Sequence, residues 1–283
     1  MDQKIITLYD KYTHSQLSRK EFMKKLAILT GSTALALTVL PLLENNYVSA
    51  AEFESDEITA EEITYPGVEG DMKAILAKPK GKKNLGAVLV IHENRGLTPH
   101  IKDVTKRVAL AGFVALGVDA LSPLGGTPED ENKGRELIGK LDAEENLQNY
   151  LKALDFLRAH PLGNGKTGVV GFCWGGAMAN KLAVADPLLN AAVAYYGSQA
   201  KVEDVPKIKA SLLLQYGGLD ERINAGIPAY EAALKANKID YQLYIYEGVN
   251  HAFNNDTAPT RYNEAAAKLA WQRTIDLFKK KLG

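Results

Sequence analysis

The single cysteine of the chain, Cys173, lies in the segment GFCWG at residues 171–175. The segment follows a short apolar run typical of a buried strand and precedes an alanine-rich stretch typical of a helix. A sharp strand-to-helix turn holds a nucleophile at its strained apex, and flanking glycines relieve crowding there. Amide groups at the start of a helix also favour a thiolate. The pattern therefore predicts that Cys173 is a nucleophile, against the alternative of a small buried apolar side chain.

Two further residues could complete a nucleophilic site. Asp220 follows the apolar run 211–216 in a glycine-bounded turn, and His251 follows the run 241–246. The order cysteine, aspartate, histidine is the nucleophile–acid–histidine order of the α/β-hydrolase arrangement. Each residue comes directly after a predicted strand, where parallel sheets place their sites. The alternative for Asp220 is a turn-forming role alone.

The other histidines fit this scheme less well. His14 lies near the N-terminus in a predicted leader, and His160 stands beside a proline after a predicted helix. His92 and His100 remain alternatives, although they flank a different loop. His92 and Glu93 are adjacent, and no second histidine has the ligand spacing, so the sequence does not support a zinc site of the HExxH type.

The loop 91–96 ends the first central strand, where such folds place the second oxyanion donor. The backbone N–H groups of Asn94 and Trp174 are therefore the candidate oxyanion hole. Glu93 beside them could accept the thiol proton or keep the thiol neutral, and the alternative is a structural salt bridge with Arg95 or another base. Aromatic side chains near these motifs are expected to line the substrate pocket: Trp174, Tyr196 and Phe253.

The order of apolar runs predicts an α/β fold. A hairpin is expected over 63–67 and 72–77, and then six strands at 87–91, 113–118, 168–171, 191–196, 211–216 and 241–246. Helices are expected over 100–111, 143–159, 175–185, 226–237 and 261–281. This alternation indicates a three-layer αβα domain over 63–283 with a mostly parallel sheet. The long connection 121–140 is either a lid or pocket wall, or a surface excursion.

The first fifty residues resemble an export signal. A basic start precedes eighteen uncharged residues, Leu26–Leu43, and the small-residue exit Val48–Ala50. The segment SRKEFMK at 18–24 is similar to the twin-arginine export motif, with Lys20 in place of the second arginine. We therefore expect export to the periplasm or the exterior through the export machinery and signal peptidase. The alternatives are an uncleaved membrane anchor and a buried core helix.

Composition limits the partners. The chain of 283 residues has a net charge of zero, which argues against nucleic-acid binding. One cysteine excludes an internal disulfide and any cysteine-built zinc or iron–sulfur site. The acidic segment 51–62 is expected to be a solvated, mobile arm. We expect a monomer or a small homo-oligomer.

Taken together, the segments 91–96, 171–176, 218–220 and 250–253 resemble the dienelactone hydrolase (carboxymethylenebutenolidase) family. The resemblance runs from about residue 60 to 281. It implies an α/β-hydrolase fold, a Cys173–His251–Asp220 triad, Glu93 near the resting thiol, and no cofactor or metal. The implied reaction is hydrolysis of a small-molecule ester or lactone through an acyl-cysteine.

The sequence departs from the dienelactone-specific pattern at two arginines that grip the substrate carboxylate. The segment 119–123 lacks the first, and Asn255 stands where the second is expected, four residues after the histidine. We take Asn255 and Arg95 as candidate substrate-binding residues, with Arg222 and Arg261 as possible substitutes. The reaction class is therefore predicted without a dienelactone substrate. A different class of function, an idle exported binding or redox-sensing protein, is the alternative.

Overall fold

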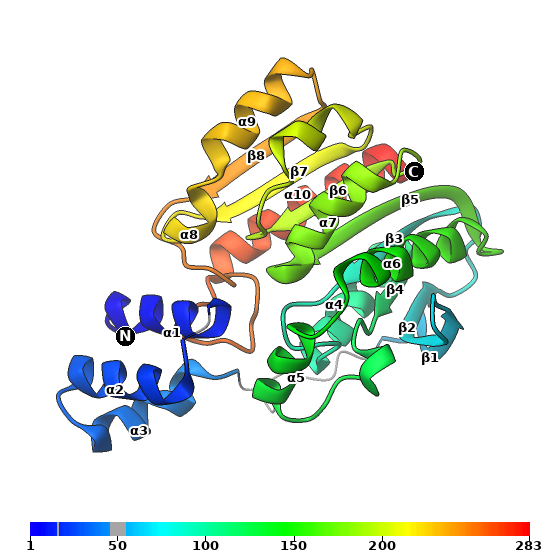
Figure 1. The fold of residues 1–283 in the computed structure, drawn as a ribbon. Helices are drawn as coiled ribbons and strands as arrows, with labels where there is room; N and C mark the ends of the chain where they lie inside the picture. The colour runs from blue at the N-terminus through cyan, green and yellow to red at the C-terminus, as the bar shows by residue number, and fades with distance from the viewer. Residues whose placement is uncertain (16, 46–54) are drawn as a thin grey trace.

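A computed structural model describes residues 1–15, 17–45 and 55–283. Its centre is one eight-stranded sheet with the strand order β1-β2-β4-β3-β5-β6-β7-β8 (Figure 1). β1 and β2 form an antiparallel hairpin, β2 pairs antiparallel with β4, and the remaining pairs are parallel. The strands are β1 (Ile58–Pro66), β2 (Asp71–Pro79), β3 (Leu85–Ile91), β4 (Val114–Val118), β5 (Gly163–Phe172), β6 (Ala191–Tyr195), β7 (Ser211–Gly217) and β8 (Tyr241–Tyr246).

Helices cover both faces of the sheet because the central strands are apolar on both sides. In β3, Val88 and Val90 pack against one apolar cluster, whereas Leu89 and Ile91 pack against the other. α4 and α10 supply the first cluster, and α6, α7 and α9 supply the second. The helices of this layer structure are α4 (Pro99–Leu110), α5 (Glu131–Ile138), α6 (Ala143–Arg158), α7 (Trp174–Ala185), α8 (Glu221–Asn224), α9 (Ile227–Ala236) and α10 (Glu264–Leu282), with short 3₁₀ turns η2 (Ser122–Leu124) and η3 (Val202–Lys207). The predicted α/β-hydrolase architecture, with its N-terminal hairpin, is confirmed.

The hairpin begins earlier than predicted. β1 starts at Ile58, so the second half of the expected acidic arm 51–62 is a strand, and residues 51–54 lie outside the described residues. The acidic side chains of this edge strand face solvent and meet lysines: Glu61 lies 2.7 Å from Lys78, and Glu62 lies 2.7 Å from Lys102. A one-sided, solvated edge strand has little of the apolar signal that marks the central strands.

Three N-terminal helices pack beside the sheet: α1 (Gln3–His14), α2 (Arg19–Thr30) and α3 (Thr33–Leu43) (Figure 1). They share a small apolar cluster of their own, which includes Tyr9, Phe22 and Leu40. The uncharged run 26–43 is broken at Gly31, whose φ of 86° ends α2, and the two helices meet at 109°. Neither helix alone is long and apolar enough to cross a membrane within the described residues, although the bent pair meets the criterion together.

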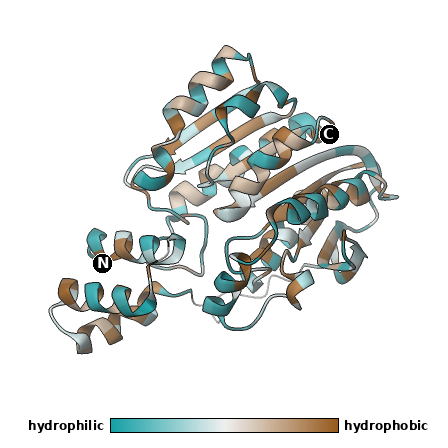
Figure 2. Cartoon of the chain, in the orientation of Figure 1, coloured by the Kyte–Doolittle hydropathy of each residue, from teal (hydrophilic) through white to brown (hydrophobic). Residues whose placement is uncertain are grey.

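Hydropathy follows the layers of the fold. In Figure 2 the apolar residues concentrate on the strands of the sheet and on the inward sides of the helices, while the outer helix surfaces are mostly polar. Some large apolar side chains of the α2–α3 pair remain exposed, among them Ile28, Leu35 and Leu37.

Candidate active site

The predicted strand-to-helix turn is present at Cys173. β5 ends at Phe172, α7 begins at Trp174, and Cys173 between them has a φ of 56° and a ψ of −113°. Its backbone N–H donates to the carbonyl of Tyr195 at 3.0 Å, which fixes the strained conformation. A Cβ on Gly171 would lie 1.9 Å from the carbonyl oxygen of Gly175, so the strand and the helix approach too closely for any other residue.

His251 and Asp220 form a buried dyad. His251 Nδ1 lies 2.5 Å from Asp220 Oδ2, and the other oxygen of Asp220 accepts the backbone N–H of Ile223 at 3.2 Å. Because Nδ1 carries the proton that Asp220 accepts, the neutral ring presents its lone pair at Nε2. That Nε2 is buried and has no hydrogen-bond partner among the described residues. It belongs to the same group of atoms as Cys173 Sγ and His14 Nε2, which all lie within 4.8 Å of one another.

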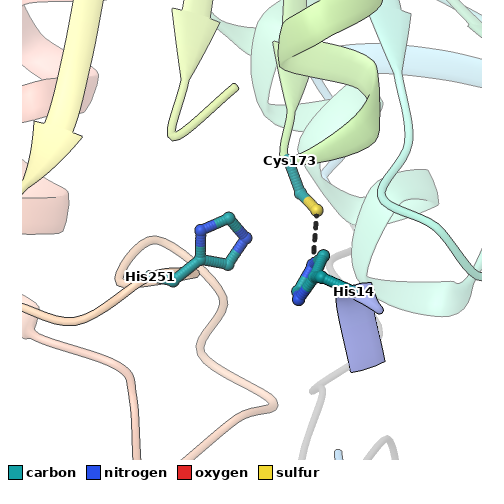
Figure 3. A group of neighbouring side chains, drawn as sticks. All are labelled: His14, Cys173 and His251. Atoms are coloured by element: carbon teal, nitrogen blue, oxygen red, sulfur yellow. Dashed lines mark hydrogen bonds between the residues drawn. The ribbon is translucent and has the colours of Figure 1, made fainter. Parts of the chain in front are cut away.

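His14 also contacts the sulfur, a position that sequence reasoning missed. Its Nε2 lies 3.0 Å from Cys173 Sγ, and its ring stands edge-on to that of His251 with 4.7 Å between centroids (Figure 3). His14 Nδ1 lies 3.1 Å from Asp10 Oδ1, one helical turn earlier on α1. The spacing of Asp10 and His14, four residues apart on an amphipathic stretch, could have indicated an aspartate–histidine pair on one helix face. The interpretation of residues 1–50 as an export signal led away from that pair.

The electrostatics couple His14 to the thiol. Burial lowers the pKa of His14, but the neighbouring Cys173 and the hydrogen bond that His14 donates to Asp10 raise it more, so the net pKa lies above its ordinary value. The pKa of Asp10 is well below its usual range: burial raises it, whereas His251, His14 and Arg222 lower it more. The site therefore favours the cationic form of the His14 imidazole.

Glu93 accepts hydrogen bonds from two side chains. Its Oε2 accepts from Asn255 Nδ2 at 2.8 Å, and its Oε1 accepts from Tyr196 OH at 3.5 Å. Burial raises its pKa, but His100 and the arginines Arg261 and Arg95 lower it more, so the carboxylate is held ionised. The place of Glu93 near the resting thiol stays a prediction.

Two of the predicted substrate-binding residues, Asn255 and Arg95, bond to other side chains of this protein. Asn255 is 1% exposed, and its Oδ1 accepts from Thr257 while its Nδ2 serves Glu93. Arg95 is bound by Glu131, at 2.7 Å, and by Tyr9 OH, at 3.2 Å. The salt-bridge partner that the structure gives Arg95 is therefore Glu131 of α5 and not Glu93.

Phe253, which was predicted to line the substrate pocket, is fully buried against Tyr196, with 5.3 Å between the ring centroids. It does not line the cavity at Cys173, whereas Tyr196 and Trp174 do.

The alternative histidines also have structural partners. His92 Nε2 accepts the N–H of Ala120 at 3.2 Å, and His100 Nδ1 lies 3.0 Å from Asp256.

The loop 91–96 lies against the start of α7, as an oxyanion hole requires. The His92 ring stacks on Trp174 with 5.4 Å between centroids and an angle of 9°. Asn94 and Trp174 both line the cavity at Cys173, and the Asn94 side chain donates to the carbonyl of Thr13 at 2.9 Å. The assignment of their backbone N–H groups to an oxyanion stays a prediction.

A cavity of about 500 Å³ opens beside Cys173. Its walls come from α1, from α5 within the segment 121–140, and from the loops that carry His251 and Arg222. The pocket-wall interpretation of that long segment is therefore the correct one. A larger cavity of about 1020 Å³ lies on the β1–β2 side of the sheet, and Cys173 does not line it.

Comparison with known proteins decides the family. The sequence model of the dienelactone hydrolase family matches residues 72–282. The chain belongs to the dienelactone hydrolase family. A second model, described as YqhI-like, matches residues 1–32. Membership makes the chain a hydrolase.

Relatives cover most of the chain. A Salmonella typhimurium protein named "Putative carboxymethylenebutenolidase" is 32% identical over 237 residues, which are 78% of this chain and 87% of that protein. A protein of the same name from Methylorubrum extorquens is 27% identical over 97% of this chain and 98% of its own length. Among solved structures, a dienelactone hydrolase-like promiscuous phosphotriesterase from metagenomic libraries is 26% identical, with a TM-score of 0.72 over 80% of this chain and 100% of that one.

Proposed function

We propose that this hydrolase cleaves a small carboxylic ester or lactone through an acyl-cysteine intermediate on Cys173. The observation that carries the proposal is the dyad His251–Asp220, whose unpartnered Nε2 lies within 4.8 Å of the sulfur. A nucleophile, a base and a group that orients the base are the three parts that such catalysis needs.

The chemistry would proceed in two halves. His251 Nε2 takes the proton of the Cys173 thiol, the thiolate attacks the carbonyl carbon, and the carbonyl oxygen takes the negative charge in reach of the N–H groups of Asn94 and Trp174. When the intermediate collapses, the carbon–oxygen bond to the leaving group breaks and protonated His251 gives its proton to the departing alkoxide. A water then attacks the acyl-cysteine, His251 takes its proton, and the acid leaves as the thiolate returns.

The thiolate must be supplied by the site, because an ordinary thiol is only a few per cent ionised near neutrality. In the chain that retains residues 1–50, His14, with its raised pKa and its Nε2 at 3.0 Å from the sulfur, supports the anionic form. A cavity of about 500 Å³ fits a small ester or lactone as the substrate class.

The test is turnover of p-nitrophenyl acetate by wild type, Cys173→Ala and His251→Ala. We expect both variants to lose at least about 10³-fold in kcat/KM. Equal turnover by all three proteins would overturn the proposal and favour the idle binding or redox-sensing alternative.

Export remains part of the proposal, supported by the basic start and the uncharged run Leu26–Leu43. Mass spectrometry of the N-terminus in the native host tests it. A terminus at Ala51 supports cleavage, whereas a terminus at or near Met1 in a cytoplasmic fraction would contradict export.

A further inference from the structure

Three side chains that bind soft metal ions meet at one point. His14 Nε2, Cys173 Sγ and His251 Nε2 all lie within 4.8 Å of one another, and they come from α1, from the turn before α7 and from the loop after β8 (Figure 3). Zn²⁺ bonds of about 2.0–2.3 Å to nitrogen and sulfur place tetrahedral ligand atoms about 3.3–3.6 Å apart. Small side-chain rotations bring the three atoms to that separation.

Each histidine is held in the form that a metal requires. His14 Nδ1 lies 3.1 Å from Asp10 Oδ1, and His251 Nδ1 lies 2.5 Å from Asp220 Oδ2. Once His14 has given up its second proton, the proton that remains on each ring is on Nδ1, and Nε2 faces the sulfur. A carboxylate behind the histidine is the usual outer partner of a zinc-binding imidazole. Here the arrangement occurs twice around one cysteine.

The group also carries an orphaned polar atom. His251 Nε2 is buried, in a residue that is 4% exposed, and has no hydrogen-bond partner among the described residues. A buried ring nitrogen without a partner costs free energy unless something occupies its lone pair. The cavity of about 500 Å³ borders all three ligand residues, so a fourth ligand could enter from that side.

We propose that the full chain binds one Zn²⁺ ion through His14, Cys173 and His251, with the fourth position open to the cavity. Two carboxylates, Asp10 and Asp220, and the thiolate supply negative charge around the ion, while Arg222 lies 3.4 Å from Asp10 and also borders the cavity. Binding releases the proton shared between His14 and Cys173, because both groups must present a lone pair.

Occupancy would inhibit hydrolysis, a consequence that rests on the proposed function. The ion takes the sulfur lone pair that attacks the carbonyl and the Nε2 that accepts the proton. Zn²⁺ would thus be a reversible inhibitor whose affinity depends on α1. Metal binding itself does not depend on turnover, so the two ideas can fail separately.

The helix that carries His14 is anchored well enough to serve as a ligand-bearing element. Arg135 Nη1 donates to the carbonyl of Tyr12 at 3.0 Å, and its guanidinium lies 4.3 Å from the centroid of that tyrosine ring. Asn94 Nδ2 donates to the carbonyl of Thr13 at 2.9 Å, directly beside His14. These contacts fix the last turn of α1 against the hydrolase body.

The experiment uses Co²⁺ as a spectroscopic probe on the purified full-length protein. We expect one Co²⁺ per chain, a thiolate-to-cobalt charge-transfer band in the near ultraviolet, and loss of that band when Zn²⁺ is added. Cys173→Ser and His14→Ala should both abolish the band, while His160→Ala, which removes a histidine outside the cluster, should retain it.

Asp10→Asn keeps all three ligands and the shape of α1. We expect it to weaken Zn²⁺ binding by about 10–100-fold, measured by competition with a chromophoric chelator. A circular dichroism spectrum and melting curve for each variant show that the fold is intact.

Absence of the band in wild type would overturn the proposal, and so would a band of unchanged intensity in His14→Ala, because the ion would then be held without α1. If Co²⁺ binds as described but no ester is turned over by the metal-free protein, the metal site stands and the proposed function fails. If the ester is turned over and no metal binds, the reverse holds.

Discussion

At the scale of single residues, one sulfur atom faces two histidines, and each histidine rests on its own aspartate. The pair His251–Asp220 comes from loops after parallel strands, so the order of motifs along the sequence was enough to predict that the two residues meet. The pair His14–Asp10 comes from a helix 159 positions before Cys173, and no strand-end rule brings it there. Side-chain packing alone determines that contact, so it was not predicted.

The orienting role of Asp220 gives the first prediction. Asp220→Asn removes the acceptor for His251 Nδ1–H, which lets the ring adopt the wrong tautomer. We expect kcat/KM for p-nitrophenyl acetate to fall by about 10⁴-fold.

Asp155→Asn is the control, because Asp155 lies on the surface of α6 and pairs with Arg158 there. A loss of less than tenfold in Asp220→Asn would show that Asp220 is a turn-forming residue and not an orienting acid.

At the scale of elements, the backbones of β5, α7 and the loop 91–96 lie unusually close to one another where they meet. A Cβ on Gly171 would meet the backbone of Gly175 at 1.9 Å, and one on Gly175 would meet the carbonyl of His92 at 2.5 Å. No side-chain rotation relieves an overlap with backbone. The glycines of the cysteine motif therefore serve packing as well as the turn itself.

Gly171→Ala tests this packing. We expect a loss of about 3 kcal/mol or more in the free energy of unfolding, measured by urea denaturation. Gly139→Ala is the matched control, since Gly139 has helical dihedrals of −67° and −11° and its Cβ would make contacts of 3.4 Å or more. Its stability should stay within about 1 kcal/mol of wild type. Similar losses in the two variants would contradict the packing argument.

Docking of α1 gives a pH-dependent prediction. The folded-state pKa of His14 is raised above 6.5, with Cys173 and Asp10 raising it against burial and the nearby His251. A raised pKa contributes stability that is complete below the unfolded-state value and is lost as pH rises through the folded-state value. The melting temperature of wild type minus that of His14→Gln should therefore be largest at or below about pH 6.5 and should shrink toward alkaline pH. A difference that grows with pH would contradict a protonated His14.

Most of the elements could be predicted because strands buried on both faces leave continuous apolar runs. β6 and β8 follow the predicted positions to within one residue, and α6 and α7 do as well. The early start of β1 was missed because its acidic residues face solvent at the edge of the sheet. The break at Gly31 was missed because an uncharged run gives no sign of a sharp bend between two short helices.

At the scale of the whole molecule, the chain is a hydrolase sheet with a small helical unit seated over its catalytic edge. The unit has its own apolar cluster, and Tyr12 belongs to that cluster while also meeting the hydrolase body. The Tyr12 ring stacks on Phe22 with 4.4 Å between centroids, and its hydroxyl donates to Asn132 Oδ1 at 3.3 Å.

Tyr12→Ala should loosen this unit and expose the sulfur. Because Cys173 is the only cysteine, alkylation by iodoacetamide reports its accessibility directly. At about pH 9, above the ordinary thiol pKa, we expect the alkylation rate to rise tenfold for each ~1.4 kcal/mol of docking energy lost. Tyr241→Ala should leave the rate unchanged, because Tyr241 lies on β8 and its hydroxyl donates to Glu231 of α9. An unchanged rate in Tyr12→Ala would mean that α1 does not limit access.

The position of α1 also provides partners for arginines of the hydrolase domain near the active site. Arg222 is balanced there by Asp10, Arg135 by the carbonyl of Tyr12, and the Arg261 guanidinium lies 5.3 Å from the ring centroid of Tyr9. A chain trimmed after residue 50 would lose all three of these partners at once. The cavity beside Cys173 would then lack the wall that α1 supplies, and Arg222 would lack its carboxylate partner. Removal of the first fifty residues would thus open the site around the sulfur without altering any residue of the sheet.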